Sequence, residues 1–253
     1  DPATAQSELG VVIRTKYSTP EPIRRASLYD SYKFVLDDLA EAEKRLDKEE
    51  DAYSNEYITS AAAQALHARV ALYMQDWDTA IEYASILIDD KKNTFKLADA
   101  KTKYNADYTF FDYMWAYDLS YEIIWRIGFT ETSYGSPLGT VFLNFTKDLT
   151  YFYPDYVPAT AALNLYDAAD LRYSGYFAGK EQGLTIGYTN GLDWPMLVKY
   201  YGNRNFTSKL IFHVSMPKPF RLAEQYLIRA EAYCRKNDFT KAGNDLTALR
   251  KMR

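Results

Sequence analysis

Apolar residues recur at helical spacing in two stretches that lie far apart in the chain, residues 65–80 and 227–242. When these stretches are aligned, the pairs that coincide are Ala68 with Ala230, Asp76 with Asp238, Trp77 with Phe239, Ala80 with Ala242 and Leu87 with Leu249. The small residues allow two helices to approach closely, and we expect the aromatic residue to fill the gap at their turn. This arrangement is typical of the tetratricopeptide hairpin, which is a scaffold for binding.

A further helix is predicted over residues 28–46, where apolar residues lie on one face and charged residues on the opposite face. Ser27 with Asp30 forms a cap that is typical of a helix start. The two hairpins are predicted at residues 60–89 and at about residues 221–250, and the aligned aspartates are the expected N-caps of their second helices. A lone hairpin cannot bury both of its faces, so we expect all these helices to pack in one layer.

Between the two hairpins the helical periodicity is poor and aromatic residues are dense. From residue 104 to residue 156, 17 of 53 residues are aromatic, against 16% in the whole chain. Residues 122–127 and 197–201 indicate short strands, and Asn190-Gly191 is a strong signal for a two-residue β-hairpin turn.

The predicted fold is therefore mainly α: a tetratricopeptide-like helical scaffold that carries an irregular, loop-rich, aromatic-rich lobe with short strands. We expect a single domain over residues 1–253. Its scaffold helices would lie in residues 28–90 and 218–253, and residues 91–217 would form an inserted ligand-binding lobe.

Composition and charge exclude several classes of function. The net charge of −4 and the pI near 5.4 argue against a basic nucleic-acid surface. No apolar run approaches the roughly 18 residues of a membrane helix. The single cysteine, Cys234, is expected to be a small buried residue and cannot form an internal disulfide. The two histidines, His67 and His213, lie far apart without cysteine partners, so no metal site is expected.

Several local strings match one family in the same order along the chain. The most specific is Arg-Leu-Ala-Glu-Gln-Tyr-Leu-Ile-Arg-Ala-Glu-Ala at residues 221–232. The other matching strings lie at residues 25–27, 37–42, 65–73, 77–80, 122–125, 166–172, 199–200 and 245–250. Together they resemble the SusD-like (RagB/SusD) outer-membrane nutrient-binding lipoproteins of Bacteroidetes over nearly the whole chain.

This resemblance implies a surface-exposed lipoprotein of the outer membrane that captures a glycan and passes it to a SusC-like TonB-dependent transporter. It implies no catalytic activity and no cofactor. The lipid-bearing N-terminal cysteine, the first part of the scaffold and the C-terminal tail of the family have no counterpart in the sequence. We therefore expect the chain to be a fragment of a longer protein, whose lipid anchor lies outside it.

The aromatic residues are the main candidates for ligand binding. A flat ring covers the apolar face of a sugar, while nearby polar side chains bind its hydroxyl groups. The candidates adjoin polar, glycine or proline positions, where side chains tend to stay exposed. The predicted platform consists of Trp115, Tyr134, Tyr153 and Trp194, with Asn190 and Asp193 at its edge. Trp77 and Trp125 are expected in the core. Starch, mannan, xylan and host glycans all offer the sugar face that such rings recognise.

Two other functions fit parts of the sequence. A surface glycoside hydrolase needs two carboxylates that converge on one sugar bond. Carboxylates of the aromatic region are Asp112, Asp118, Glu122, Glu131, Asp148, Asp155 and Asp193, but no catalytic motif accompanies them. A peptide-binding tetratricopeptide adaptor would need a concave groove lined by Asn, Lys and Arg, which the Ala-rich residues 61–71 do not obviously supply.

Overall fold

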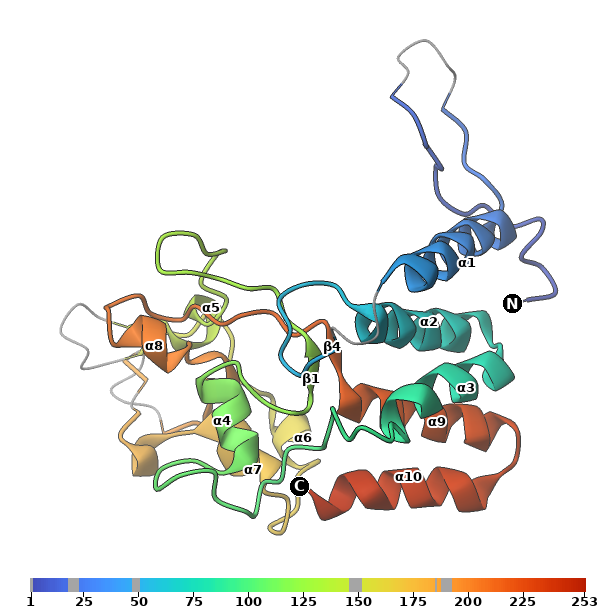
Figure 1. The fold of residues 1–253 in the computed structure, drawn as a ribbon. Helices are drawn as coiled ribbons and strands as arrows, with labels where there is room; N and C mark the ends of the chain where they lie inside the picture. Colours follow the sequence, from blue (N-terminus) through green and yellow to red (C-terminus); the bar gives the residue numbers. More distant parts are fainter. Residues whose placement is uncertain (1, 18–22, 47–50, 146–151, 185, 188–192) are drawn as a thin grey trace.

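Five long helices form one layer of the molecule (Figure 1). They are α1 (Leu28–Arg45), α2 (Ser60–Met74), α3 (Trp77–Ile88), α9 (Leu222–Arg235) and α10 (Phe239–Lys251). Each packs against the next in that order, so the helices of the two sequence-distant hairpins are adjacent. The structure is a computed structural model that describes residues 2–17, 23–46, 51–145, 152–184, 186–187 and 193–253. It confirms the predicted fold class, which is mainly α.

The two predicted hairpins are α2–α3 and α9–α10, and the same cap begins the second helix of each. The carboxylate of Asp76 accepts a hydrogen bond from the backbone N–H of Thr79 at 3.2 Å, and that of Asp238 accepts one from Lys241 at 3.1 Å. Ser27 caps α1 in the same way. These bonds satisfy backbone donors that the first helical turn leaves free, and they confirm the caps read from the sequence.

Alanine residues let the central helices of the layer approach closely. Ala68 of α2 and Ala80 and Ala84 of α3 are fully buried, and they form one cluster with Ile228 and Ala232 of α9. Protein interiors are close-packed, so a larger side chain at such a position would separate the helices or strain them. The predicted role of the small residues is confirmed.

Two expectations for the second hairpin are wrong. Phe239, expected to fill the gap at the turn as Trp77 does, is 64% exposed, and Cys234 is exposed rather than buried. Trp77 packs against the alanine cluster because α3 lies between α2 and α9. Phe239 begins α10, which lies at one edge of the layer and packs on α9 alone among the long helices.

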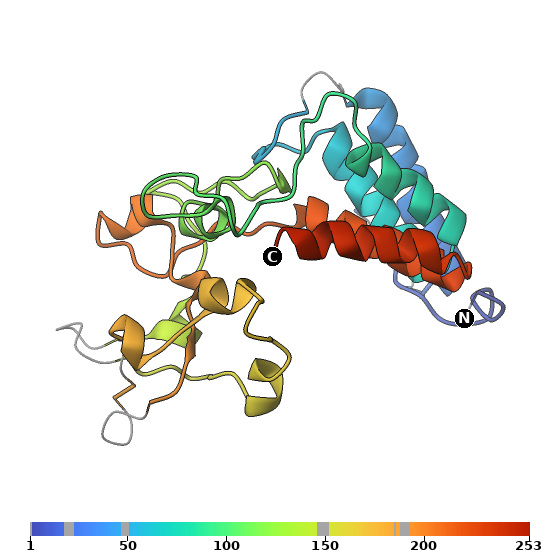
Figure 2. The same ribbon diagram turned by 90° about the horizontal axis from the view of Figure 1, so that it is seen from below.

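The lobe lies at one end of the helical layer and is built from short elements (Figure 2). These are α4 (Phe110–Ala116), β1 (Ile123–Trp125), α5 (Thr140–Leu143), α6 (Thr160–Leu163), α7 (Arg172–Tyr176), β2 (Phe177–Ala178), η2 (Lys180–Gln182), β3 (Met196–Leu197), η3 (Val198–Tyr200), α8 (Arg204–Thr207) and β4 (Phe220–Arg221). None of the helices in the described segments is both long and apolar enough to cross a membrane.

Two short antiparallel strand pairs order the lobe. β1 pairs with β4, with Ile123 opposite Arg221, and β2 pairs with β3. The predicted strand at residues 122–127 is therefore present but shorter. The strand predicted at residues 197–201 is wrong beyond Leu197, because Val198–Tyr200 forms a 3₁₀ helix. The turn predicted at residues 190–191 lies outside the described residues.

The junction between layer and lobe is apolar on the side of the layer. Phe220 of β4 and Ile124 of β1 pack against the buried alanines at the start of α2. The indole of Trp125 is half-buried there and stacks on Phe220 with 6.0 Å between the ring centroids, so this tryptophan contributes to the core only in part.

Candidate functional site

Helix α4 directs aromatic residues into the middle of the lobe. A capping box fixes its first turn: the hydroxyl of Thr109 accepts from the backbone N–H of Asp112 at 3.1 Å, and the Asp112 carboxylate accepts from that hydroxyl at 2.7 Å. With the helix start fixed, Phe111, Met114 and Trp115 face the interior and form a core cluster with Ile123 of β1 and residues of the preceding loop.

A cavity of about 490 Å³ lies beside α4, within the lobe. It has aromatic walls from Tyr108, Trp115 and Tyr201, and it also has carboxylate, amide and guanidinium groups. A second cavity of about 260 Å³ adjoins it. The two share Ser174, Ala178 and Gln182, and we call them together the lobe groove. Polar residues of the groove are Asp107, Asp112, Ser174, Lys180, Glu181, Gln182, Asp193 and Arg204.

The groove offers the two kinds of contact that a sugar needs. Its rings can cover the C–H face of a pyranose, and its polar side chains can exchange hydrogen bonds with the hydroxyl groups. Arg204 is held over the ring of Tyr201, with 4.5 Å between its Cζ atom and the ring centroid. Gly202, next to Tyr201, has a φ of +115°, and a Cβ there would lie 2.8 Å from the backbone N of His213. A glycine is therefore needed where the chain turns at the groove.

Two of the residues predicted from the sequence border this groove. Trp115 lines its first cavity and Asp193 its second. The expected exposure of Trp115 is wrong, since the side chain is only 8% exposed. The reason is that the short helix α4 is covered on this side by other aromatic residues, including Tyr176 and Tyr200.

Tyr134, Tyr153 and Trp194 do not line the groove. Tyr134 is 45% exposed in a loop and contributes to neither cavity. The expected exposure of Trp194 is also wrong: its half-buried ring packs on an apolar cluster, and its N–H donates to the backbone oxygen of Pro158 at 2.9 Å. Tyr153 is half-buried as well. Asn190 lies outside the described residues.

Sequence reasoning missed Tyr108 and Tyr201, the other two rings of the first cavity, and also Tyr173 and Phe177 of the second. Tyr201 precedes a glycine and polar residues, which is the same context that selected the predicted aromatic residues, so that signal could have found it. Tyr108 follows a polar loop in the same manner. They line the same cavity only because of the tertiary fold, since Tyr108 precedes α4 and Tyr201 follows η3, far apart in the chain.

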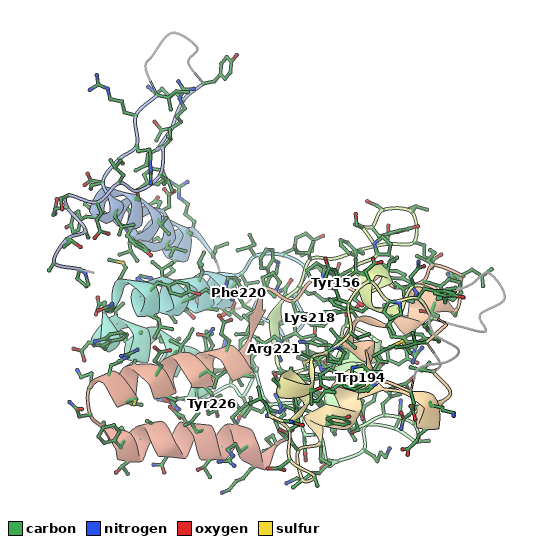
Figure 3. All side chains as sticks on the ribbon, turned by 180° about the vertical axis from the view of Figure 1, so that it is seen from behind. Tyr156, Trp194, Lys218, Phe220, Arg221 and Tyr226 are labelled. Carbon is green, nitrogen blue, oxygen red and sulfur yellow. The ribbon has the colours of Figure 1, made fainter. Side chains whose placement is uncertain are left out.

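On another side of Trp115 lies a cavity of about 310 Å³, which we call the cationic pocket. It is lined by Trp115, Leu138, Lys199, Tyr200, Ser215, Met216, Pro217, Lys218, Pro219 and Arg221. Figure 3 shows Lys218 and Arg221 where the helical layer meets the lobe. The indole centroid lies 5.0 Å from the Lys218 nitrogen and 5.2 Å from Cζ of Arg221. Cations at such distances are attracted by the negative face of the ring.

Two fully buried carboxylates hold the cations of this junction. Asp118 pairs with Lys218 and also accepts hydrogen bonds from the backbone N–H of Met216 at 3.0 Å and from Asn203 at 2.8 Å. Burial lowers the pKa of Lys218, and the charge of Asp118 opposes this effect. Every polar atom of such a pair needs a partner, because a buried unpaired charge is strongly destabilising.

Glu122 makes the second set of buried bonds. Its carboxylate accepts from Arg221 at 2.9 Å, from Arg253 of the last turn at 2.6 Å, and from the backbone N–H of Ala98 at 2.8 Å. These contacts join Glu122 to three other segments of the chain. No group of three or more His, Cys, Asp or Glu side chains that could hold a metal ion occurs in the part of the chain that the structure describes.

No protein-family model matches the chain. No curated protein matches it in sequence. Solved structures, however, match nearly its whole length. A SusD superfamily protein from Bacteroides thetaiotaomicron superposes with a TM-score of 0.72 at 23% identity, over 98% of this chain and 52% of that one. A SusD-like carbohydrate binding protein from Bacteroides vulgatus gives a TM-score of 0.70 at 19% identity, over 97% of this chain and 49% of that one.

Surface glycan-binding protein A from Bacteroides uniformis is similar too, with a TM-score of 0.69 at 15% identity, over 99% of this chain and 56% of that one. The chain thus spans about half the length of the structures it matches. The expected tetratricopeptide-like scaffold with an irregular lobe agrees with these matches. We conclude that the chain has the SusD-like fold.

Proposed function

We propose that this chain is the part of a cell-surface glycan-binding protein that contacts oligosaccharide through its lobe groove. The observation that carries the proposal is the fold, which the chain shares with a SusD-like carbohydrate binding protein and with a surface glycan-binding protein. The groove supplies suitable chemistry, because aromatic rings and hydrogen-bonding side chains line the same cavity. The glycan would lie against Tyr108 and Tyr201, with hydroxyl groups near Gln182 and Arg204.

The complete protein would sit at the outer membrane as a lipoprotein and deliver its glycan to a SusC-like TonB-dependent transporter. This part of the proposal rests on the sequence resemblance at residues 221–232 and on the similar fold. Binding at the surface would concentrate the glycan next to the transporter. The anchor and any further ligand contacts would belong to parts of the protein outside this sequence.

Binding without catalysis is the function that the carboxylates support best. Asp112 is engaged in the capping box of α4, and Asp118 and Glu122 are buried in ion pairs. An acid and a nucleophile or base must instead converge on one glycosidic bond. A surface glycoside hydrolase, the rival function, would have to use the remaining acidic residues of the groove.

A peptide-binding adaptor receives less support. Such a protein would offer the inner face of its helices to a peptide. In this chain the Ala-rich face of α2 is packed against neighbouring elements, and Ala61, Ala65 and Ala68 are completely buried. The polar and aromatic cavities described above lie in the lobe instead.

A binding screen of the complete protein tests the proposal. A panel of plant, storage and host oligosaccharides would be titrated by calorimetry, and each mixture would then be analysed for cleavage by chromatography. We expect at least one glycan to bind and to remain intact. Turnover that persists through rigorous purification and follows the protein would replace the proposed function with the hydrolase. Failure to bind any glycan would reject it.

A further inference from the structure

Lys199 is a cation that the buried ion pairs leave without a counter-charge. Its side chain is partly buried in the cationic pocket, where Lys218 is paired with Asp118 and Arg221 with Glu122. Among the described residues, no carboxylate forms an ion pair with Lys199. Partial burial of an unpaired ammonium group is unfavourable, so its presence in a cavity calls for a physical reason.

Aromatic rings are what surround the Lys199 ammonium group in place of a carboxylate. Its nitrogen lies 4.3 Å from the ring centroid of Trp115, 4.9 Å from that of Tyr176 and 5.3 Å from that of Tyr200. Cation–π contacts of this kind stabilise a charge without neutralising it. The pocket therefore keeps a net positive charge, and the ammonium group of Lys199 can still form an ion pair with an anion.

The charges of the neighbouring side chains make that positive field stronger. Glu122 forms ion pairs with both Arg221 and Arg253, and Asp118 forms one with Lys218, so these three cations share two carboxylates. Lys199 adds a fourth cation. A cavity with low-dielectric walls and an excess of one charge concentrates ions of the opposite sign. Its volume of about 310 Å³ is at the lower end of the range of about 300–1,000 Å³ that is common for ligand sites.

Trp115 connects this pocket to the lobe groove, because its side chain lines both cavities. Residues 198–201, which follow β3, also divide between the two cavities. Val198 and Tyr201 line the groove, whereas Lys199 and Tyr200 line the pocket. The two cavities thus lie on either side of a shared wall. A branched or substituted glycan in the groove could reach the pocket around the edge of Trp115.

We propose that the cationic pocket binds the negatively charged group of an acidic glycan, with a carboxylate or sulfate oxygen placed at the ammonium group of Lys199. This inference rests on the proposed glycan-binding function and narrows its ligand to uronic-acid-type or sulfated saccharides. The sugar ring that bears the charge would lie against Tyr200 and Leu138. The ammonium group of Lys199 would donate charge-assisted hydrogen bonds directly to the oxygen atoms of the anion.

The pocket also gives the binding a pH dependence. Burial, and then the charges of Arg221 and Lys218, lower the pKa of Lys199 to about 8. Tyr176, whose own pKa is raised by burial, and Tyr200 also face the ammonium group. The protonated form binds the anion, so affinity for the acidic glycan should be constant below pH 8 and fall above it. Binding near pH 8 should take up a proton.

The test uses calorimetry on the complete protein with two oligosaccharides of equal length, one neutral and one carrying a uronic acid, and with a sulfated analogue as a third arm. The variants are Lys199→Met, which removes the charge, and Lys199→Arg, which keeps it. Lys209→Met is the matched control, because Lys209 is an exposed lobe lysine that pairs with Glu131. Near-ultraviolet circular dichroism would verify the fold of each variant.

We expect Lys199→Met to weaken the acidic ligands about tenfold or more and to leave the neutral ligand unchanged. Lys199→Arg should retain most of the affinity, and Lys209→Met all of it. A preference for the uronic or the sulfated arm would identify the anion. If neutral glycans bind but Lys199→Met changes nothing for the acidic ones, the pocket inference is wrong and the glycan-binding function stands.

A second measurement tests the cationic pocket without an oligosaccharide, and so independently of the proposed glycan-binding function. Free glucuronate would be titrated into the complete protein while the side-chain nitrogen of Lys199 is followed by nuclear magnetic resonance. We expect the pKa of Lys199 to rise on binding. If no oligosaccharide binds in any arm of the calorimetric test, the proposed glycan-binding function is wrong. If glucuronate leaves the pKa of Lys199 unchanged, the proposal that the cationic pocket binds an anion is wrong.

Discussion

The helical layer and the lobe are stabilised in different ways. In the layer, small residues at regular intervals allow α2, α3 and α9 to pack closely, and α1, α3 and α10 are each capped by the side chain of the residue that precedes them. In the described part of the lobe no helix exceeds the seven residues of α4. Its order comes from buried carboxylates that bind backbone groups and cations far away in the chain.

This difference explains why the binding features gather in the lobe. A close-packed layer of alanines leaves no room for a ligand, whereas short elements joined by loops leave cavities between them. The cost is that the lobe depends on a few polar contacts, each of which must be complete. The two regions should therefore respond differently to substitution.

The largest effect is expected from Lys218→Met in the lobe. The substitution leaves the carboxylate of Asp118 buried without its cation, and breaking a buried pair in this way costs about 3–5 kcal/mol. Urea unfolding would measure the loss. Lys33→Met is the control in the layer, because Lys33 forms an exposed pair with Asp37, and solvent-screened pairs of this kind contribute little to stability. Equal losses for both variants would mean that the buried pair does not stabilise the lobe.

A smaller loss is expected from Ala230→Trp in the layer. Ala230 is buried in α9, so the indole would force neighbouring helices apart and cost about 1–3 kcal/mol or more. Glu231→Trp, at the next and exposed position of the same helix, should have little effect. The melting temperature of each variant measures the difference. An unchanged melting temperature for Ala230→Trp would contradict the close packing described here.

Lys199→Met should stabilise the lobe near neutral pH. The folded-state pKa of Lys199, about 8, lies below its unfolded value of 10.5, so protonation destabilises the folded chain. This penalty is complete below pH 8, shrinks as the pH rises toward 10.5 and then vanishes. A gain of about 1–3 kcal/mol is expected at pH 7, given 1.36 kcal/mol for each unit of pKa difference and partial exposure to solvent. Urea unfolding of both proteins at pH 7 and pH 10 measures it. A gain that does not shrink with pH would contradict the assigned pKa.

The layer could be predicted from the sequence because its determinants are local. The cap residues Asp76 and Asp238 and the spacing of the alanines each act within a few positions, so alignment of the two hairpins located them. The same reasoning failed for Phe239, because exposure depends on whether another helix lies beyond α10. Local pattern indicates that a residue belongs to a helix, but the neighbours of that helix decide which face is buried.

The site was predictable only in part. The sequence predicts Trp115 and Asp193, and both border the groove, but the expectation that aromatic residues near turns stay exposed is wrong for Trp115 and Trp194. Burial of these rings depends on residues brought close by the fold. Tyr108 is not among the residues that the sequence predicts. The ion pair of Asp118 with Lys218 joins residues about 100 positions apart, so a pattern of neighbouring residues in the sequence cannot predict it.

The central claim, that glycan binds in the lobe and not on the helical layer, is tested most directly by two tyrosine substitutions. Tyr108 lines the groove, and Tyr73 of α2 is 67% exposed on the layer. Calorimetric titration of the complete protein with a glycan from the screen would compare Tyr108→Ala with Tyr73→Ala. A stacked ring contributes on the order of 1 kcal/mol, so Tyr108→Ala should lower affinity about fivefold and Tyr73→Ala should leave it unchanged. Unchanged affinity for Tyr108→Ala together with a loss for Tyr73→Ala would contradict the claim.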